Sequence, residues 1–148
     1  MILIREARNT DVSSIFNLIK ELAVFEKAEN SLINTPEQLL KDGFSNNPAY
    51  KCWVAEKNDL VIGIALCYIK YSTWNGQCLY LEDLIVTQSE KGQGIGKILM
   101  DEIILFAKQS QYKQVQWQVL DWNQAAIDFY KKYDAQFSNE WVNVSVKV

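Results

Sequence analysis

One stretch, residues 79–100, constrains the fold more than any other part of the chain. It reads LYLEDLIVTQSEKGQGIGKILM, an apolar run followed by a glycine-rich loop and an apolar helical pattern. Gly92, Gly94 and Gly96 stand at every second position, so the backbone can turn tightly before a helix that we expect to begin near Ile95. Successive amides in such a turn, together with the first turn of a helix, bind phosphate. The stretch therefore predicts a strand, loop and helix that hold a phosphate group.

Length and charge narrow the class of protein. The chain has 148 residues, of which 49% are hydrophobic, so we expect a single domain spanning residues 1–148 with a core of its own. The net charge of -3 offers no basic surface, which disfavours nucleic acid as a partner and favours a small cation. No apolar run approaches the length needed to cross a bilayer, so we expect a soluble protein with no membrane partner. The three cysteines, which lack metal-ligand spacing, favour the cytoplasm.

Missing and isolated residue types exclude several chemistries. The chain contains no histidine, which removes the commonest zinc ligand and every mechanism with an imidazole base, so we expect no metal. Cys52, Cys67 and Cys78 lie in apolar runs without the spacing of metal ligands and are expected to be reduced, buried thiols. Any proton transfer must then use a carboxylate, tyrosine, lysine, cysteine or water.

Hydrophobic periodicity predicts a mixed α/β order of elements. Thr10 or Asp11 is a candidate cap for the first helix, and the sequence Thr35 to Gln38 predicts a capping box for the second. Lys57 to Asp59 is expected to form a hairpin turn. The expected strands cover residues 2–6, 51–56, 60–70, 78–86, 115–119 and 142–148, and the expected helices cover residues 12–23, 36–43, 95–106 and 123–133.

Two acids interrupt the apolar strand at residues 79–86. Glu82 and Asp83 are adjacent, so in a regular strand they point to opposite faces and meet different surroundings. An unpaired carboxylate in an apolar interior costs several kcal/mol, so each acid requires a cation, strong donors or a water-filled cleft. An internal ion pair with lysine or arginine is one interpretation. A cleft that accepts a cationic amine is the other.

Two kinds of phosphate loop and a plain glycine turn are the interpretations of the glycine-rich segment. A Walker loop requires a hydroxyl after its lysine, but Ile98 follows Lys97. A dinucleotide-binding fold requires GxGxxG early in a βαβ unit, whereas this chain has GxGxG after several strands that look antiparallel. A plain glycine turn between a strand and a helix is the third interpretation.

The loop KGQGIG, residues 91–96, resembles the pyrophosphate loop of the GCN5-related N-acetyltransferases (GNAT), usually written [QR]xxGx[GA]. Lys91 departs from the usual first residue. The segments ELAVFEKAEN, YSTWNGQCLYLED and LDWNQAAIDFYKKYDAQ are similar to the diamine (spermidine/spermine) N-acetyltransferases, most of all to the thialysine N-epsilon-acetyltransferase branch. The resemblance implies a largely antiparallel central sheet flanked by about four helices, and acetyl-CoA as the cosubstrate.

The resemblance also assigns site residues. For acetyl-CoA it implies the strand backbone at Leu84, Ile85 and Val86, the loop residues Lys91, Gly92, Gln93, Gly94, Ile95, Gly96 and Lys97, and Asn123. A helix cap is the equally good interpretation of Asn123. For the amine pocket it implies Phe25, Glu26, Trp74, Glu82, Asp83 and Glu140.

Two residues are implied in the chemistry itself. An ammonium group must lose a proton before it attacks the thioester, and Glu82 is the candidate acceptor, through water. Tyr130 is the candidate acid that protonates the departing thiolate, although a core aromatic is the simpler interpretation of this residue alone.

One departure from the family concerns the substrate. Polyamine-acetylating relatives carry Asp and Pro where this chain has Ser72 and Thr73, which favours a thialysine-like or lysine-like amino acid or a short diamine over spermine. The alternatives are a protein or peptide N-acetyltransferase and a CoA-binding module without turnover. The family and an exposed last strand also predict a homodimer.

Overall fold

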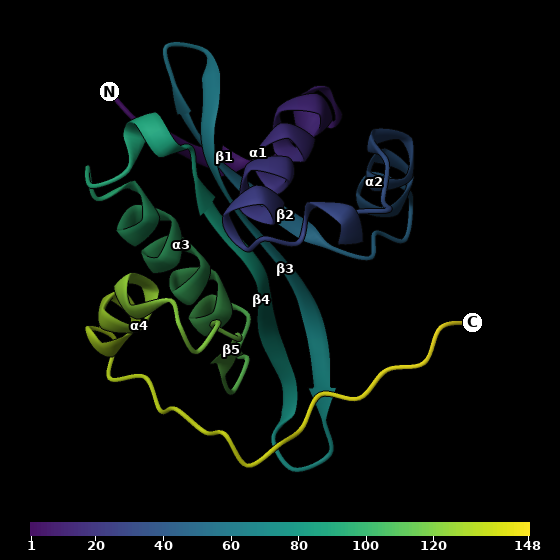
Figure 1. The fold of residues 1–148 in the computed structure, drawn as a ribbon, viewed down its shortest axis with the longest axis vertical. Helices are drawn as coiled ribbons and strands as arrows, with labels where there is room; N and C mark the ends of the chain where they lie inside the picture. Colours follow the sequence, from purple (N-terminus) through teal and green to yellow (C-terminus); the bar gives the residue numbers. More distant parts are fainter. The chain divides into compact units, whose positions relative to one another are not determined.

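The computed structural model describes residues 1–148 and divides them into two compact units, residues 1–117 and residues 118–148. The first unit holds every strand and three α-helices, and the second holds one α-helix (Figure 1). In chain order the elements are β1 (Leu3–Glu6), α1 (Val12–Phe25), α2 (Pro36–Gly43), β2 (Lys51–Lys57), β3 (Leu60–Ser72), β4 (Gly76–Val86), α3 (Ile95–Gln109), β5 (Val115–Gln116) and α4 (Gln124–Lys131). The predicted mixed α/β class is confirmed.

The sheet of the first unit has the strand order β1-β2-β3-β4-β5. The first four strands pair antiparallel, and only β4 and β5 run parallel. Asn58 and Asp59 turn β2 into β3 with φ of 51° and 61°, the left-handed conformation that two-residue hairpin loops require. β5 is shorter than predicted, because only Val115 and Gln116 pair with β4.

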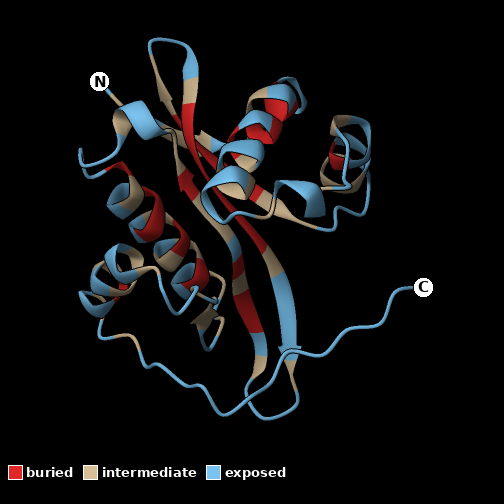
Figure 2. Cartoon of the chain, viewed as in Figure 1, coloured by how far each residue is buried: buried red, intermediate tan, exposed pale blue.

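Helices cover both faces of this sheet. On one face the buried core joins side chains of α1 and α2 to Cys52 and Val54 of β2 and to Leu66 and Ile85 of the next two strands. On the other face Trp53 packs against Phe106 of α3, with 4.9 Å between ring centroids. Figure 2 shows the buried residues concentrated along the middle of β2 to β4 and on parts of α1 and α3. Sheet residues in the middle of the unit therefore point into two separate cores.

The helix starts only partly follow the sequence signals. Thr35 caps α2 as predicted, since its Oγ1 accepts a hydrogen bond from the backbone N–H of Gln38 at 3.1 Å. The reciprocal half of the capping box is absent, because the N–H of Thr35 donates to Oδ1 of Asn34 at 2.9 Å and the Gln38 side chain turns to Asp42. Asp11 precedes α1 but makes no side-chain cap. Its carboxylate binds Arg5 and the backbone N–H of Arg8.

The second unit contains α4 and an extended tail. Asn123 caps α4, because its Oδ1 accepts a hydrogen bond from the N–H of Ala126 at 3.2 Å. Asp134, after the helix, has a left-handed conformation with φ of 52°. The strand predicted at residues 142–148 is wrong: the segment forms no strand, and its four valines are exposed. Alternating valines favour an extended chain but supply no hydrogen-bonding partner for it. The predicted homodimer stays a prediction.

Two expectations about side chains and membranes can be compared with the structure. Cys52, Cys67 and Cys78 are buried and form no disulfide, as predicted. None of the helices combines the length and the apolar character that crossing a bilayer requires.

Candidate active site

The ladder between β3 and β4 contains an irregularity at Glu82. Leu66 pairs with Asp83, and the next residue, Cys67, pairs with Leu81. Glu82 therefore has no partner on β3 and is the extra residue of a β-bulge. A bulge of this kind changes the direction of the side chains on the bulged strand and commonly lies next to active sites.

The bulge places both acids on one face of the sheet. Asp83 lies opposite Leu66, which faces the core beneath α1. Tyr80, two residues before Glu82, pairs with Tyr68, and their rings lie 5.1 Å apart. Since residues two apart share a face, Tyr68 follows Leu66 to the α1 side, and Glu82 follows Tyr80 there. The prediction that Glu82 and Asp83 point to opposite faces is therefore wrong, because the regular alternation fails at the bulge.

The charges around Asp83 are all of the same sign. Burial, followed by the charges of Glu82 and Glu26, raises the pKa of Asp83 to about 6. Partial desolvation also raises the pKa of Glu26, which follows the last residue of α1. Neither Glu82 nor Asp83 forms an ion pair, so the internal pair considered from the sequence is wrong. Three carboxylates thus converge without a cation.

Two tyrosines beside these acids were not identified from the sequence. The pKa of Tyr68 and that of Tyr80 are raised by burial, and Glu82 contributes to both. The ammonium of Lys70 lies 5.3 Å from the ring centre of Tyr80. The two-residue spacing between Tyr80 and Glu82 was a usable signal for the first of them. Tyr68 could be found only through its pairing with Tyr80.

The glycine loop has the geometry that anion binding requires. Gly92 and Gly94 both have φ of 80°, a conformation that side chains disfavour, and Gly94 directly precedes α3. The helix begins at Ile95, as predicted, and the residues of the loop from Lys91 to Gly94 are exposed. Free N–H groups at the start of α3 point out of the helix at this position. The loop therefore exposes backbone N–H groups of the kind that bind phosphate at a helix N-terminus.

The end of α1 connects the loop with the acids. The ammonium of Lys91 lies 4.8 Å from the ring centre of Phe25, the last residue of α1. The next residue, Glu26, raises the pKa of Asp83. Phe25 thus contacts the loop, while its neighbour in the chain acts on the acid cluster.

The second half of β4 pairs with a neighbouring strand on one side only. β5 pairs with β4 only at Leu79 and Tyr80, so the edge of β4 that faces away from β3 is unpaired over Leu84, Ile85 and Val86. Backbone N–H and C=O groups on such an edge can pair with another extended chain. The edge runs from the acid cluster toward the glycine loop.

Within a single chain, Trp74 lies far from Glu82 and Asp83. Trp74 lies at the exposed turn of the β3–β4 hairpin, between the paired residues Ser72 and Gly76. Six steps along the ladder separate that pair from Leu66 and Asp83, which corresponds to about 20 Å at about 3.3 Å per residue.

Three predicted site residues belong to the second unit. Tyr130 is buried, and burial raises its pKa to about 12. The predicted helix cap at Asn123 is confirmed, and its predicted contact with acetyl-CoA stays a prediction. Glu140 is exposed in the tail that follows the helix.

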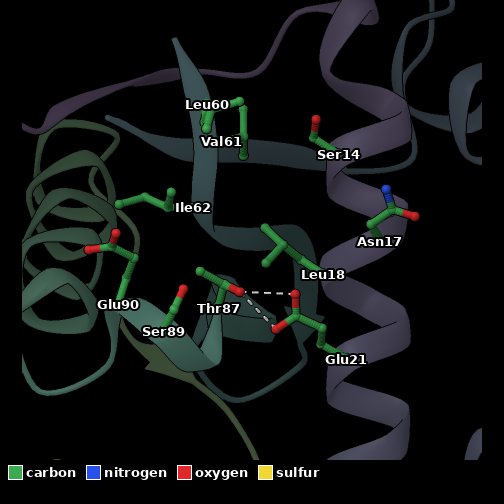
Figure 3. A pocket seen from close by; sticks show the side chains of 10 residues that line it. All are labelled: Ser14, Asn17, Leu18, Glu21, Leu60, Val61, Ile62, Thr87, Ser89 and Glu90. Carbon is green, nitrogen blue, oxygen red and sulfur yellow. Dashed lines mark hydrogen bonds between the residues drawn. The ribbon is translucent and has the colours of Figure 1, made fainter. Parts of the chain in front are cut away.

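A separate pocket of about 320 Å³ lies between α1 and the neighbouring ends of β3 and β4 (Figure 3). Glu21 of α1 accepts hydrogen bonds from the hydroxyl of Thr87 at 3.0 Å and from the N–H of Gln88 at 3.4 Å. None of the three clustered carboxylates lines this pocket. Its hydrogen bonds fasten the segment after β4 to α1.

The chain is similar in sequence and in fold to proteins of known families. Residues 13–134 match the Acetyltransferase (GNAT) family. Thialysine N-epsilon-acetyltransferase of Mus musculus is 40% identical over 141 residues, covering 90% of this chain and 83% of the relative, and the Bos taurus protein of the same name is 39% identical over 143 residues, covering 91% and 84%. The fold is similar to that of an aminoglycoside acetyltransferase from a soil metagenome, with a TM-score of 0.81 at 22% identity, covering 99% of this chain and 96% of that one.

Proposed function

The chain belongs to the acetyltransferase (GNAT) family, and from this premise we propose that it transfers an acetyl group from acetyl-CoA to a primary amine of a small cationic substrate. The substrate class is a thialysine-like or lysine-like amino acid or a short diamine. Relatives named thialysine N-epsilon-acetyltransferase, 39% and 40% identical to this chain, support the choice.

The observation that carries the proposal is the cluster of Glu26, Glu82 and Asp83. Three carboxylates lie on one side of the sheet with no cation among them, so their like charges disfavour the ionised form of each group. A cationic amine in this cluster relieves the repulsion, because each nearby positive charge favours the ionised carboxylates. The rings of Tyr68 and Tyr80 offer apolar surface for the methylene groups of such a substrate and π-faces for its ammonium group.

The loop and the open edge of β4 suit the other substrate. Amides from Gly92 to Lys97 and the N-terminus of α3 would hold the pyrophosphate of acetyl-CoA, assisted by the charge of Lys91. The unpaired backbone of Leu84, Ile85 and Val86 would hydrogen-bond the amides of the extended arm. The thioester then lies between the loop and the acids.

The chemistry requires two proton transfers and no protein nucleophile. Glu82 accepts the proton of the substrate ammonium through water, and the free amine nitrogen attacks the thioester carbon directly. As the carbon–sulfur bond breaks, Tyr130 donates its proton to the departing thiolate. The thiols of Cys52 and Cys67 are poor alternatives as nucleophiles, because burial raises the pKa of Cys67 to about 12 and that of Cys52 further.

The preference for a short substrate rests on the difference from polyamine-acetylating relatives, which carry Asp and Pro where this chain has Ser72 and Thr73. The hydroxyl oxygen of Ser72 accepts hydrogen bonds from the N–H groups of Trp74 at 3.2 Å and Asn75 at 3.1 Å. Ser72 therefore stabilises the turn and carries no charge that could bind a second ammonium. On this ground we favour a thialysine-like amino acid or a short diamine over spermine.

An assay across amines tests the proposal. The release of CoA from acetyl-CoA should be measured with thialysine, lysine, short diamines, spermine and a peptide amine, with the Glu82→Gln variant as a control for the site. We expect the highest kcat/KM with thialysine or a short diamine. Equal or higher kcat/KM with spermine contradicts the short-substrate assignment, and preference for the peptide supports a protein N-acetyltransferase. Acetyl-CoA binding without turnover of any amine supports a non-catalytic module.

A further inference from the structure

Glu90 makes two contacts that join the glycine loop to the sheet. Its Oε2 atom accepts a hydrogen bond from Nζ of Lys57 at 2.7 Å and another from Nε2 of Gln93 at 2.9 Å. Lys57 is the last residue of β2, and Gln93 stands between the two left-handed glycines, Gly92 and Gly94. One carboxylate oxygen therefore connects the middle of the loop with a strand 33 residues earlier.

This carboxylate lies beside a loop whose N–H groups suit an anion, where a free negative charge opposes binding. The ammonium of Lys57 offsets that charge directly. The hydrogen bond from Lys57 also lowers the pKa of Glu90, with a smaller contribution from Gln93, so the side chain stays ionised at neutral pH. The Glu90 carboxylate therefore accepts two hydrogen bonds, while the net charge of the pair that it forms with Lys57 is close to zero.

The loop needs such a restraint because of its glycines. Glycine has more conformational freedom than any other residue, so an unrestrained Gly-x-Gly loop loses more entropy when it closes on a ligand. The start of the same segment is already fastened to α1, where Glu21 accepts hydrogen bonds from the hydroxyl of Thr87 (Figure 3). Glu21 also accepts one from the N–H of Gln88. The contact between Glu90 and Gln93 extends that restraint into the loop itself.

We propose that Glu90 is a positioning residue for the cosubstrate. Together with Lys57 and Gln93 it holds the loop in the shape that aims its amides at a pyrophosphate, and it does not itself touch the ligand. The proposal rests on the acetyl-CoA binding put forward above. Its consequence is that the affinity for CoA depends on a lysine at the end of β2, outside the loop motif.

Calorimetric titration of the whole protein with CoA tests this role. We expect Glu90→Ala and Lys57→Met each to weaken CoA binding by about three- to tenfold, as loss of a charged hydrogen bond predicts. Glu90→Gln should bind nearly as well as the wild type, because its amide oxygen still accepts from Gln93 and Lys57. In steady-state assays the KM for acetyl-CoA should rise in the Ala and Met variants, while kcat and the KM for the amine stay unchanged.

A second ion pair in the same unit supplies matched controls. Lys51 and Glu6 lie 2.6 Å apart between β2 and β1, and Lys51→Met and Glu6→Ala should leave CoA affinity unchanged. The double variant Lys57→Met with Glu90→Ala should bind about as well as Glu90→Ala alone, since both changes remove one connection.

The outcomes separate this proposal from the proposed function. Wild-type protein that does not bind CoA contradicts the function itself. Wild-type protein that binds CoA, with Glu90→Ala equal to the wild type or no weaker than Glu6→Ala, overturns only the positioning role. Should Glu90→Ala fail to fold, Gln93→Leu removes the same contact from the loop side, and unchanged affinity in that variant overturns the role equally.

Discussion

Glu82 and Asp83 are neighbours in the chain and yet lie on the same face of the sheet, because Glu82 is the extra residue of a bulge opposite Leu66 and Cys67. Asp83 consequently carries its charge among atoms that exclude water and beside two other carboxylates. The same arrangement that attracts a cationic substrate therefore destabilises the protein in the absence of one.

Asp83→Asn should stabilise the protein at neutral pH. The pKa of Asp83 in the folded chain is about 6, above its ordinary value of 3.8, so folding is favoured while the group is protonated. That contribution is fully present below about pH 4 and is lost as the pH rises through 6. At pH 7.5 the variant should be more stable by up to about 3 kcal/mol, and at pH 4 the two proteins should be equally stable.

Denaturant unfolding at both pH values measures this difference, with Asp121→Asn, a change at an exposed position, as the control. The Asp83→Asn variant should also show a higher KM for the amine. Equal stability of variant and wild type at pH 7.5 is the result that rules out an unpaired, desolvated charge at this position.

Glu82 and Glu26 should affect different kinetic constants. Glu82→Gln removes the proton acceptor, so kcat should fall by about 100-fold or more. Glu26→Gln removes one of the charges that attract the amine, so the KM for the amine should rise by about three- to tenfold while kcat stays near the wild-type value. Steady-state kinetics with saturating acetyl-CoA separates the two effects, and an unchanged kcat in Glu82→Gln contradicts the assigned acid–base role.

Tyr130→Phe tests the proton donor. Removal of one hydroxyl should reduce kcat by about 100-fold and leave the affinity for CoA in calorimetric titration unchanged. Tyr133→Phe, on the same short unit, serves as the control and should retain activity. Full turnover by Tyr130→Phe leaves the residue with the simpler role of a buried aromatic side chain.

The glycines of the loop should differ in their tolerance of a side chain. Gly94 has φ of 80°, and an alanine in that conformation costs about 1 to 2 kcal/mol. Gly96 lies inside α3, where an added Cβ would meet only Val86 at 3.9 Å, an ordinary contact. Gly94→Ala should therefore lower the Tm by several degrees, whereas Gly96→Ala should be neutral or slightly stabilising. Thermal unfolding of the two variants side by side distinguishes them.

The sequence signals that succeeded are local ones. Glycine spacing predicts the loop and the start of α3 at Ile95, because glycine tolerates the positive φ that a tight turn before a helix requires. Thr35 predicts the start of α2, and Asn123 predicts the start of α4, through a side chain that reaches an N–H three residues ahead. Each of these signals lies within one turn of the feature that it determines.

The features that could not be predicted depend on distant partners. The bulge at Glu82 is defined by its pairing with β3, and no residue type marks it in β4 alone. The contact between Lys57 and Glu90 joins residues 33 positions apart. The valines at residues 142–148 show the converse, since a strand-like pattern without a strand to pair with forms no strand.

The single extra residue in β4 also shifts the alternation of side chains between the two faces of the sheet by one position. Before the bulge the odd-numbered residues, such as Leu79 and Leu81, face the α3 side, and after it the even-numbered residues, such as Leu84, do so. If odd and even residues are assigned to fixed faces along the whole of β4, residues after the bulge are therefore placed on the wrong side of the sheet. Deleting Glu82 would therefore remove an acid and make the alternation of β4 regular, while Asp83 stays opposite Leu66 on the α1 side.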